Sequence, residues 1–261
     1  MDKSSKYWMY QNAVQCVSAD IDFTVRAFDE WFCRHPVTLR EDFCGTALAC
    51  CEWVSRAENH QAWGVDLDAE VLSWGAENNV KRLSCSQQQR LHLLNADVRY
   101  ADVPPVDVVL AMNFSYYLFK TREALCNYFA AVRQSLNTEG LLILDAFGGH
   151  EAFQTLKESR PCDGFIYIWE QAEFDPVSHD LLCHIHFECD DGRKLSPAFS
   201  YHWRLWTLPE IRELLAEAGF SRTAVYWEGV DAKTGEGNGI YSRVEKGTPD
   251  PAWISYIVAS V

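Results

Sequence analysis

The sequence predicts an α/β fold built on an open, mostly parallel sheet. From residue 37 onward, short apolar runs of strand length alternate with helical patterns of about 10 to 15 residues, which is typical of parallel strands joined by right-handed crossovers. The chain has 261 residues, of which 48% are hydrophobic and 23% charged. A chain of this length and composition can bury the core that such a sheet needs.

The first half supplies five strands and the helices that connect them. Apolar runs predict strands at residues 37–43, 62–67, 91–95, 106–112 and 141–147. Apolar residues at helical spacing predict helices at residues 46–57, 69–82 and 122–136. Because strands and helices alternate, all five strands are expected to lie in one sheet.

The second half begins with an antiparallel segment. Residues 165–174, 181–189 and 199–206 resemble strands, and the sequences DPVSHD and DDGR between them are typical of turns. A helix is predicted within TLPEIRELLAEAGF, where Thr207 and Glu210 match a capping box and Gly219 a stop signal. Two closing strands follow at residues 222–227 and 253–258, joined by a glycine-rich connection centred on KTGEGNG.

These elements divide the chain into four parts. Residues 1–36 are expected to form an N-terminal helical cap over the ligand site, and residues 37–160 the ligand-binding α/β core. Residues 161–206 would form a small antiparallel β insert that acts as a substrate lid. Residues 207–261 would complete the core with a helix and a closing hairpin.

Charge and composition narrow the choice of partners. The formal net charge is −14 and no run of Lys or Arg interrupts it, which disfavours nucleic acid and anionic membranes. No segment has the ~20 apolar residues of a membrane span, and the N-terminus lacks the apolar region of a signal peptide. The ten cysteines form no CxxC pair and are expected to be reduced. These features predict a cytoplasmic protein with a small-molecule substrate, and they are compatible with a homodimer.

A metal site is not predicted. His184 and His186 share one face of a predicted strand, as two metal ligands would. No Cys or carboxylate lies at a recognisable spacing for a third ligand, so these histidines are interpreted as surface or turn residues.

The turn after the first strand is the first candidate site, because ligands of open α/β sheets bind beyond the carboxyl ends of the strands. It reads LREDFCGTA. Gly45 would allow a ligand to approach the backbone, and the next helix begins with free N–H groups. Glu41 is placed to accept a hydrogen bond from a cationic amine. Taken alone, the turn also fits an ordinary strand–turn–helix junction.

Acids at the next two strand ends extend this site. Asp66, in GVDLD, is placed to accept both hydroxyls of a ribose. Asp97, in NADVRY, is placed to accept the exocyclic amine of adenine, and the Val98 backbone to reach a ring nitrogen. Acids at three successive strand ends therefore match an amine, a ribose and a base in that order.

The motifs LREDFCGTA, GVDLD, NADV, VVLAMNFSYYLF and GLLILDAF, in this order, resemble those of class I methyltransferases that use S-adenosylmethionine (SAM). The resemblance implies a Rossmann-like, seven-stranded, mostly parallel sheet with a reversed last strand. It also implies SAM as cofactor, with S-adenosylhomocysteine (SAH) as its product. The cofactor-binding residues that it implies are Tyr10, in the N-terminal cap, and Arg40, Glu41, Phe43, Cys44, Gly45, Thr46, Asp66, Leu67, Asp97, Val98, Asn113 and Phe114.

The turn itself departs from the family pattern, which is D-x-G-x-G-x-G. Phe43 and Ala47 replace two of the three glycines, and only Gly45 remains. Their Cβ atoms are expected to keep a ligand from approaching the backbone everywhere that the family allows. The same two residues fit the fingerprint of nicotinamide cofactors poorly, so SAM is the better match.

Methyl transfer is an in-line displacement in which the protein aligns donor and acceptor and excludes water. Residues after the fourth and fifth strands and in the insert are expected to face the methyl group. The catalytic candidates are Asn113, Asp145, His150, Glu170 and Arg204, of which Asp145, Glu170 and His150 are alternative general bases. The substrate-binding candidates are Tyr7, Tyr117, Trp169, Tyr201, Trp203 and Arg204.

Two of these assignments stay open at this point. Arg204 fits either a clamp for a substrate carboxylate or a structural ion pair. The aromatic residues fit either a cation-binding site or simple packing. The leading prediction is a SAM-dependent methyltransferase acting on a nitrogen, oxygen or sulfur of a small molecule. The alternatives are an RNA or protein methyltransferase and a non-catalytic SAM-binding sensor or adaptor.

Overall fold

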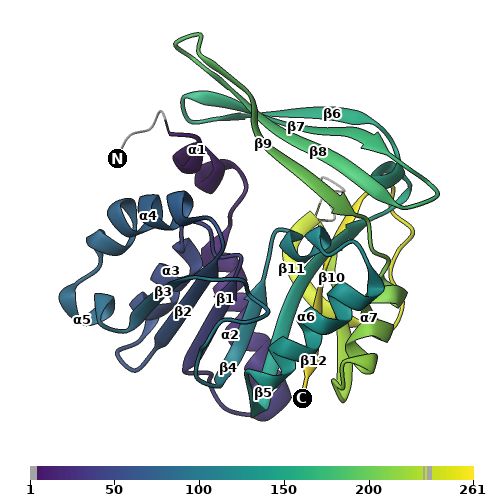
Figure 1. Ribbon diagram of the computed structural model, residues 1–261. Coiled ribbons are helices and arrows are strands. Elements are labelled where there is room, and N and C mark those ends of the chain that lie inside the picture. Colours follow the sequence, from purple (N-terminus) through teal and green to yellow (C-terminus); the bar gives the residue numbers. More distant parts are fainter. Residues whose placement is uncertain (1–4, 232, 234–236) are drawn as a thin grey trace.

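The computed structural model describes residues 5–231, 233 and 237–261. Residues 234–236 of the predicted KTGEGNG connection and residues 1–4 of the predicted cap lie outside the described residues. The chain forms one large sheet flanked by helices and a separate small sheet, which lies beside α1 at one end of the core (Figure 1). No helix in the described part of the chain is long and apolar enough to cross a bilayer.

The large sheet has eight strands in the order β11-β10-β12-β5-β4-β1-β2-β3. β1 to β5 pair in parallel, whereas β12 runs antiparallel to both of its neighbours, β5 and β10. The predicted sheet with a reversed last strand is therefore confirmed. The bounds are β1 Thr38–Asp42, β2 Gln61–Asp66, β3 Leu91–Asn95, β4 Val106–Ala111, β5 Leu136–Gly148, β10 Arg222–Val230, β11 Gly237–Val244 and β12 Trp253–Ser260.

β11 is an addition to the seven strands that the resemblance implied. It pairs antiparallel with β10 at the edge of the sheet, where the sequence predicted only a glycine-rich connection. Most of its residues are exposed, so it lacks the alternation of apolar and polar residues that marks a half-buried strand.

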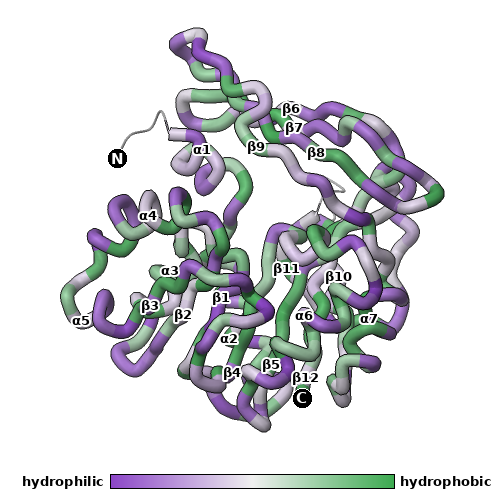
Figure 2. The backbone as a smooth tube through the Cα atoms, in the orientation of Figure 1, coloured by the Kyte–Doolittle hydropathy of each residue, from purple (hydrophilic) through white to green (hydrophobic). Residues whose placement is uncertain are grey.

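Helices cover both faces of the large sheet. α2, α3 and α4 share a buried cluster on one face, and α6 and α7 share another with β4 and β5. The central strands are the most continuously hydrophobic part of the chain (Figure 2). The capping box of Thr207 and Glu210 and the left-handed Gly219 are confirmed. The helices are α1 Lys6–Ala13, α2 Val17–Phe32, α3 Leu48–Arg56, α4 Ala69–Asn78, α5 Cys85–Gln88, α6 Arg122–Gln134 and α7 Leu208–Glu217.

The insert is a four-stranded antiparallel meander rather than a three-stranded one. Its additional first strand, β6, is mostly exposed and has no apolar period, so the insert begins at residue 156 instead of 161. Leu181, Cys183 and Trp203 belong to the same buried cluster as the core, which ties the two sheets together. The strands are β6 Leu156–Cys162, β7 Phe165–Phe174, β8 Asp180–Cys189 and β9 Lys194–Arg204.

The two N-terminal helices have different positions. α1 packs Trp8 and Met9 against Phe165 and other residues of the small sheet. α2 instead covers a face of the large sheet, where Phe28 is fully buried. Of these two helices, α1 is the one that packs against the insert.

Candidate functional site

The turn after β1 has the backbone conformation of a glycine-rich turn without most of its glycines. Phe43, Gly45 and Ala47 have φ angles of 57°, 53° and 57°. These are the three positions at which the family pattern has glycine, the residue that adopts such φ angles most readily, although two of the residues here carry a Cβ. A left-handed residue with a Cβ costs roughly 1 to 2 kcal/mol. Packing and hydrogen bonds around the turn must offset that cost.

Neighbouring elements hold this turn in place. The Gly45 N–H donates to Asp66 Oδ2 at 2.7 Å, and the Thr46 carbonyl accepts a hydrogen bond from Asn79 Nδ2 at 2.9 Å. Gln11 of α1 donates to the Thr46 hydroxyl. Gly75 of α4 lies so close that a Cβ there would be 2.5 Å from the Thr46 carbonyl oxygen. α1, β2 and α4 therefore all position the turn.

The three predicted acids differ in their surroundings. Glu41 is buried, accepts a hydrogen bond from the Cys50 N–H at 3.0 Å, and has its pKa raised to about 7, mainly by burial. Burial also raises the pKa of Asp66, whose second oxygen accepts from the Asp68 N–H. Asp97 is bound through both oxygens to Arg99, and these hydrogen bonds lower the pKa of Asp97.

Several residues expected at the cofactor are engaged elsewhere or exposed. The Arg40 guanidinium is buried, donates to Asp42 at 2.6 Å and to the Val98 carbonyl, and so stabilises the core. Cys44 is buried, and its N–H donates to a carbonyl of β2. Leu67 is 73% exposed, at the end of β2.

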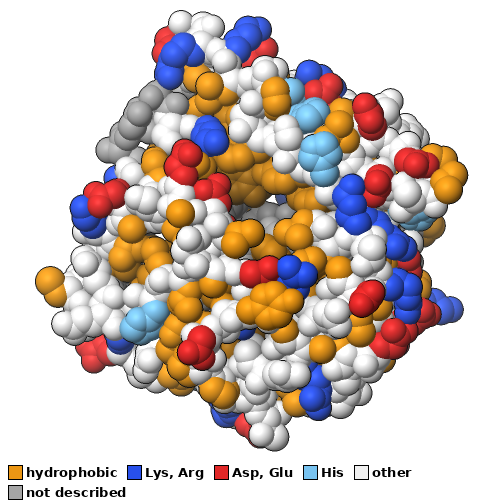
Figure 3. Space-filling model, in the orientation of Figure 1, with side chains coloured by type: hydrophobic (Ala, Val, Ile, Leu, Met, Phe, Trp, Pro, Cys, Tyr) orange, Lys and Arg blue, Asp and Glu red, His pale blue; other side chains and the backbone are white. Residues whose placement is uncertain are grey.

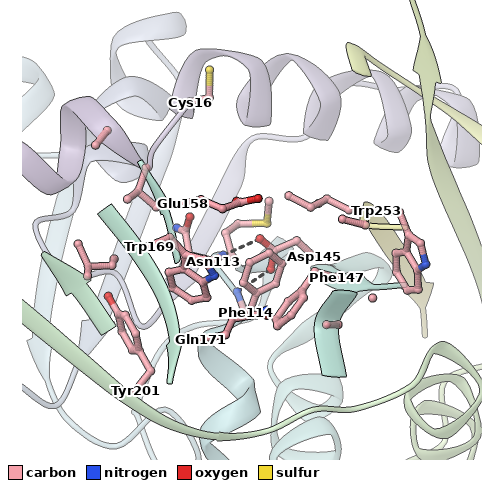
Figure 4. Close-up of a pocket in the computed structure, with 18 of the residues that line it drawn as sticks. Cys16, Asn113, Phe114, Asp145, Phe147, Glu158, Trp169, Gln171, Tyr201 and Trp253 are labelled. Carbon is pink, nitrogen blue, oxygen red and sulfur yellow. Dashed lines mark hydrogen bonds between the residues drawn. The ribbon is translucent and has the colours of Figure 1, made fainter. Parts of the chain in front are cut away.

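Asp145 of β5 organises the turn after β4. Its two oxygens accept hydrogen bonds from the N–H groups of Asn113 and Phe114 at 2.7 and 2.8 Å (Figure 4). Both residues have left-handed backbones, with φ of 58° and 56°. Burial raises the pKa of Asp145 to about 7. Because both oxygens already bind the backbone, Asp145 positions this turn.

A cavity of about 1010 Å³ lies between the turn after β4, the small sheet and the closing strands of the large sheet. Hydrophobic side chains surround a hollow on the face of the molecule that Figure 3 shows. Tyr201 and Trp203 stack with ring centroids 4.5 Å apart. Seven of the predicted residues line the cavity, namely Tyr10, Asn113, Phe114, Asp145, Trp169, Tyr201 and Trp203.

Five of the catalytic and substrate-binding candidates are not among the described residues that line the cavity. Arg204 points to the opposite side of β9 from Trp203 and pairs with Glu210 at 2.9 Å, so the structural ion pair is the reading that the structure supports. Glu170 likewise faces away and pairs with His186 at 2.7 Å. The five are Tyr7, Tyr117, His150, Glu170 and Arg204.

Some cavity residues had no marker in the sequence. Asp20 of α2 accepts a hydrogen bond from the Tyr256 hydroxyl at 2.6 Å. Tyr241 of β11 packs on Tyr256, with ring centroids 4.3 Å apart. Glu228 of β10 also lines the cavity. No local motif marks these residues, since only the strand order brings them together.

The predicted histidine pair binds side chains of the small sheet. His184 Nδ1 lies 2.9 Å from the Ser200 hydroxyl, and His186 Nδ1 lies 2.7 Å from that of Ser196. Within the described residues, no group of three or more His, Cys, Asp or Glu is arranged to hold a metal ion.

The sequence matches no protein-family model and no curated protein. Solved structures match it over nearly its whole length. A SAM-dependent methyltransferase from Clostridium acetobutylicum has 21% identity and a TM-score of 0.69, over 97% of this chain and 96% of the other. DesVI from Streptomyces venezuelae has 17% identity and a TM-score of 0.70, over 100% and 98%. CalS10, an amino pentose methyltransferase from Micromonospora echinaspora, has 15% identity and a TM-score of 0.66, over 97% and 95%. These likenesses confirm the predicted fold, which is that of class I SAM-dependent methyltransferases.

Proposed function

We propose that this protein is an enzyme that transfers the methyl group of SAM to a small molecule. The observation that carries the proposal is the turn after β1 of this chain, whose residues 43, 45 and 47 have left-handed backbones. This turn lies in a fold that resembles those of solved methyltransferases. Such a turn presents backbone N–H groups at the start of α3, where a ligand can approach Gly45 closely.

The residues around this turn fit SAM. When bound, SAM supplies a methyl group activated by a sulfonium cation. Glu41 and Asp145 offer buried carboxyl groups near that end of the site. Burial raises the pKa of each carboxyl group, and a bound cation would favour the charged forms. Asp66, at the end of β2, is the proposed partner of the ribose, and Asp97 with Val98 that of the adenine.

The position of the cavity supports a small acceptor. The cavity adjoins Asn113 and Phe114, and the small sheet supplies much of its opposite wall. A molecule bound there is enclosed by aromatic side chains such as Trp169 and Tyr201, which orient it and exclude water.

Calorimetry with SAM and with SAH tests the cofactor, and a screen of metabolite extracts with methyl-labelled SAM tests the acceptor. We expect both ligands to bind and the label to appear in small molecules. Failure to bind either ligand would contradict the whole proposal. Binding without transfer would indicate a sensor, and label in RNA or protein would indicate a macromolecular substrate.

Asp66→Ala is a direct test of the ribose assignment. We expect it to weaken SAH binding by about 1 to 3 kcal/mol, since ligand hydroxyls would lose their acceptor. Asp66→Asn is the closest control. Its one side-chain oxygen still accepts from the Gly45 N–H, whereas its amide nitrogen cannot accept from the Asp68 N–H, so we expect a smaller loss than in the alanine variant. Unchanged affinity of the alanine variant in calorimetry would show that the ribose binds elsewhere.

A further inference from the structure

The cavity beside Asn113 combines aromatic rings with acids. Of the described residues that line it, ten are aromatic, five are Asp or Glu, and only Arg160 is basic. Arg160 is already engaged, since it donates to the Ala13 carbonyl and lies over the Tyr167 ring at 5.5 Å. A molecule in the cavity therefore meets negative charge and aromatic faces, and both attract cations.

Asp20 is a carboxylate of this cavity that is held in a defined position. Its Oδ1 accepts from the Tyr256 hydroxyl at 2.6 Å, and none of the described residues donates a hydrogen bond to Oδ2. Tyr256 pairs in register with Asp145, which holds the turn of Asn113 and Phe114. Residues directly opposite on neighbouring strands point to the same face. Asp20 therefore lies on the side of the sheet that carries the Asp145 carboxyl group.

The surroundings of Asp20 contain acids and tyrosines. Glu41 on β1 and Asp145 on β5 are close enough for the charge of Asp20 to raise their pKa values. Tyr256 on β12 and Tyr241 on β11 complete the neighbourhood, and their own pKa values are raised by burial and by nearby carboxylates. Burial raises the pKa of Asp20, and the Tyr256 hydrogen bond only opposes this. Among the described residues that line the cavity, five are acids and only Arg160, which is already engaged, is basic, so acids outnumber bases there.

We propose that the methyl acceptor is an aliphatic amine that binds in its protonated form and that Asp20 is the specificity-determining residue that binds its ammonium group. Before transfer, the ammonium group passes one proton to the Asp20 carboxylate. The freed nitrogen lone pair then bonds to the methyl carbon as the bond from that carbon to the sulfonium sulfur breaks, which leaves SAH and a methylated ammonium group. This assignment rests on the proposed function, because it names the acceptor of that reaction. The ammonium group would donate to Asp20 Oδ2, while the rings of Tyr241 and Tyr256 contact the adjoining carbon atoms. A neutral alcohol of the same shape would leave the carboxylate without a counter-charge.

Calorimetry on the SAH-saturated protein tests this with cyclohexylamine and its neutral isostere cyclohexanol. We expect the amine to bind about tenfold more tightly or better, as one charge-assisted hydrogen bond implies. Asp20→Asn should remove most of that preference and leave SAH affinity within about threefold, because the change removes a charge from the acceptor site alone.

Glu158→Gln is the matched control. It removes one carboxylate from the same cavity, but Glu158 is exposed and comes from β6 of the insert (Figure 4). We expect the preference to stay within about threefold of wild type, because an exposed charge is screened by solvent. A larger loss here than in Asp20→Asn would assign the ammonium group to Glu158 and overturn the proposal.

Three further results would overturn it. These are equal binding of the two probes, a preference that survives Asp20→Asn, and loss of SAH binding in that variant, which would place Asp20 at the cofactor. If Asp20→Asn fails to fold, Tyr256→Phe provides the test, because it frees the carboxylate to move and should reduce the preference several-fold. If the wild type binds neither SAM nor SAH, the proposed function fails, and the probes titrated into the unliganded protein still test the amine site.

Discussion

The carboxyl groups of Glu41 and Asp145 both have a pKa of about 7, mainly because burial penalises their charged forms. The folded protein therefore retains these protons over a pH range in which the unfolded chain releases them. Each group contributes stability that is complete below its unfolded pKa, which is 4.5 for Glu41, and that is lost as the pH rises through 7. A cationic ligand reverses this effect because it favours the charged forms.

Glu41→Gln should abolish one of these titrations while keeping an oxygen for the Cys50 N–H. We expect little change in Tm near pH 5 and a Tm above that of wild type near pH 8, equivalent to about 1 to 3 kcal/mol. Thermal melts at both pH values measure it. Glu52→Gln, at a partly exposed ion pair on α3, serves as control, and an equal shift of Glu41→Gln at both pH values would contradict the assignment.

Single residues of the site were predictable where they follow a strand or alternate along one. Asn113 and Trp203 were expected at the cavity from strand ends and from alternation along β9, and both line it. Arg204 could not be assigned from sequence, because its partner Glu210 lies on the following helix. Asp20 and Tyr256 are 236 positions apart and meet only because β12 lies between β5 and β10, which no local pattern reveals.

Among the elements, α4 fixes the turn after β1 through the close contact of Gly75 with Thr46. Gly75→Ala would place a Cβ 2.5 Å from a carbonyl oxygen, so helix and turn would have to separate. We expect a loss of stability of about 1 to 3 kcal/mol together with weaker SAH binding. Thermal unfolding and calorimetry measure the two effects. Ser73→Ala, on the exposed face of the same helix, should change neither, and normal SAH binding by Gly75→Ala would show that the turn tolerates displacement.

The elements that sequence analysis missed share one property. β6 and β11 both lie at the edge of a sheet and are mostly exposed, so no apolar period marks them. The interior strand β7, in contrast, begins and ends at the residues that the sequence predicted, and so does β3, an edge strand that is partly buried. Burial creates the apolar pattern from which a strand can be predicted, and β6 and β11 are too exposed to show that pattern.

At the scale of the whole molecule, the net charge of −14 distinguishes the two forms of the cofactor. SAM carries one net positive charge and SAH none, so only SAM is attracted by the field of the protein. We expect SAM affinity to fall several-fold when salt rises from about 20 mM to about 0.5 M, with SAH affinity nearly constant, because salt screens the attraction. Calorimetry in both buffers measures this, and an equal response of both ligands would point to a different cause.

The place of β12 in the large sheet also bears on how the protein is made. β12 follows all the other described strands in the sequence, yet it lies between β5 and β10 and pairs with both. During synthesis, β10 and β11 therefore cannot join β1 to β5 until β12 has emerged. α1 is similar, since its partners in the insert are synthesised about 150 residues later. The cavity walls that come from α1, the insert and the closing strands thus assemble only after β12 has emerged.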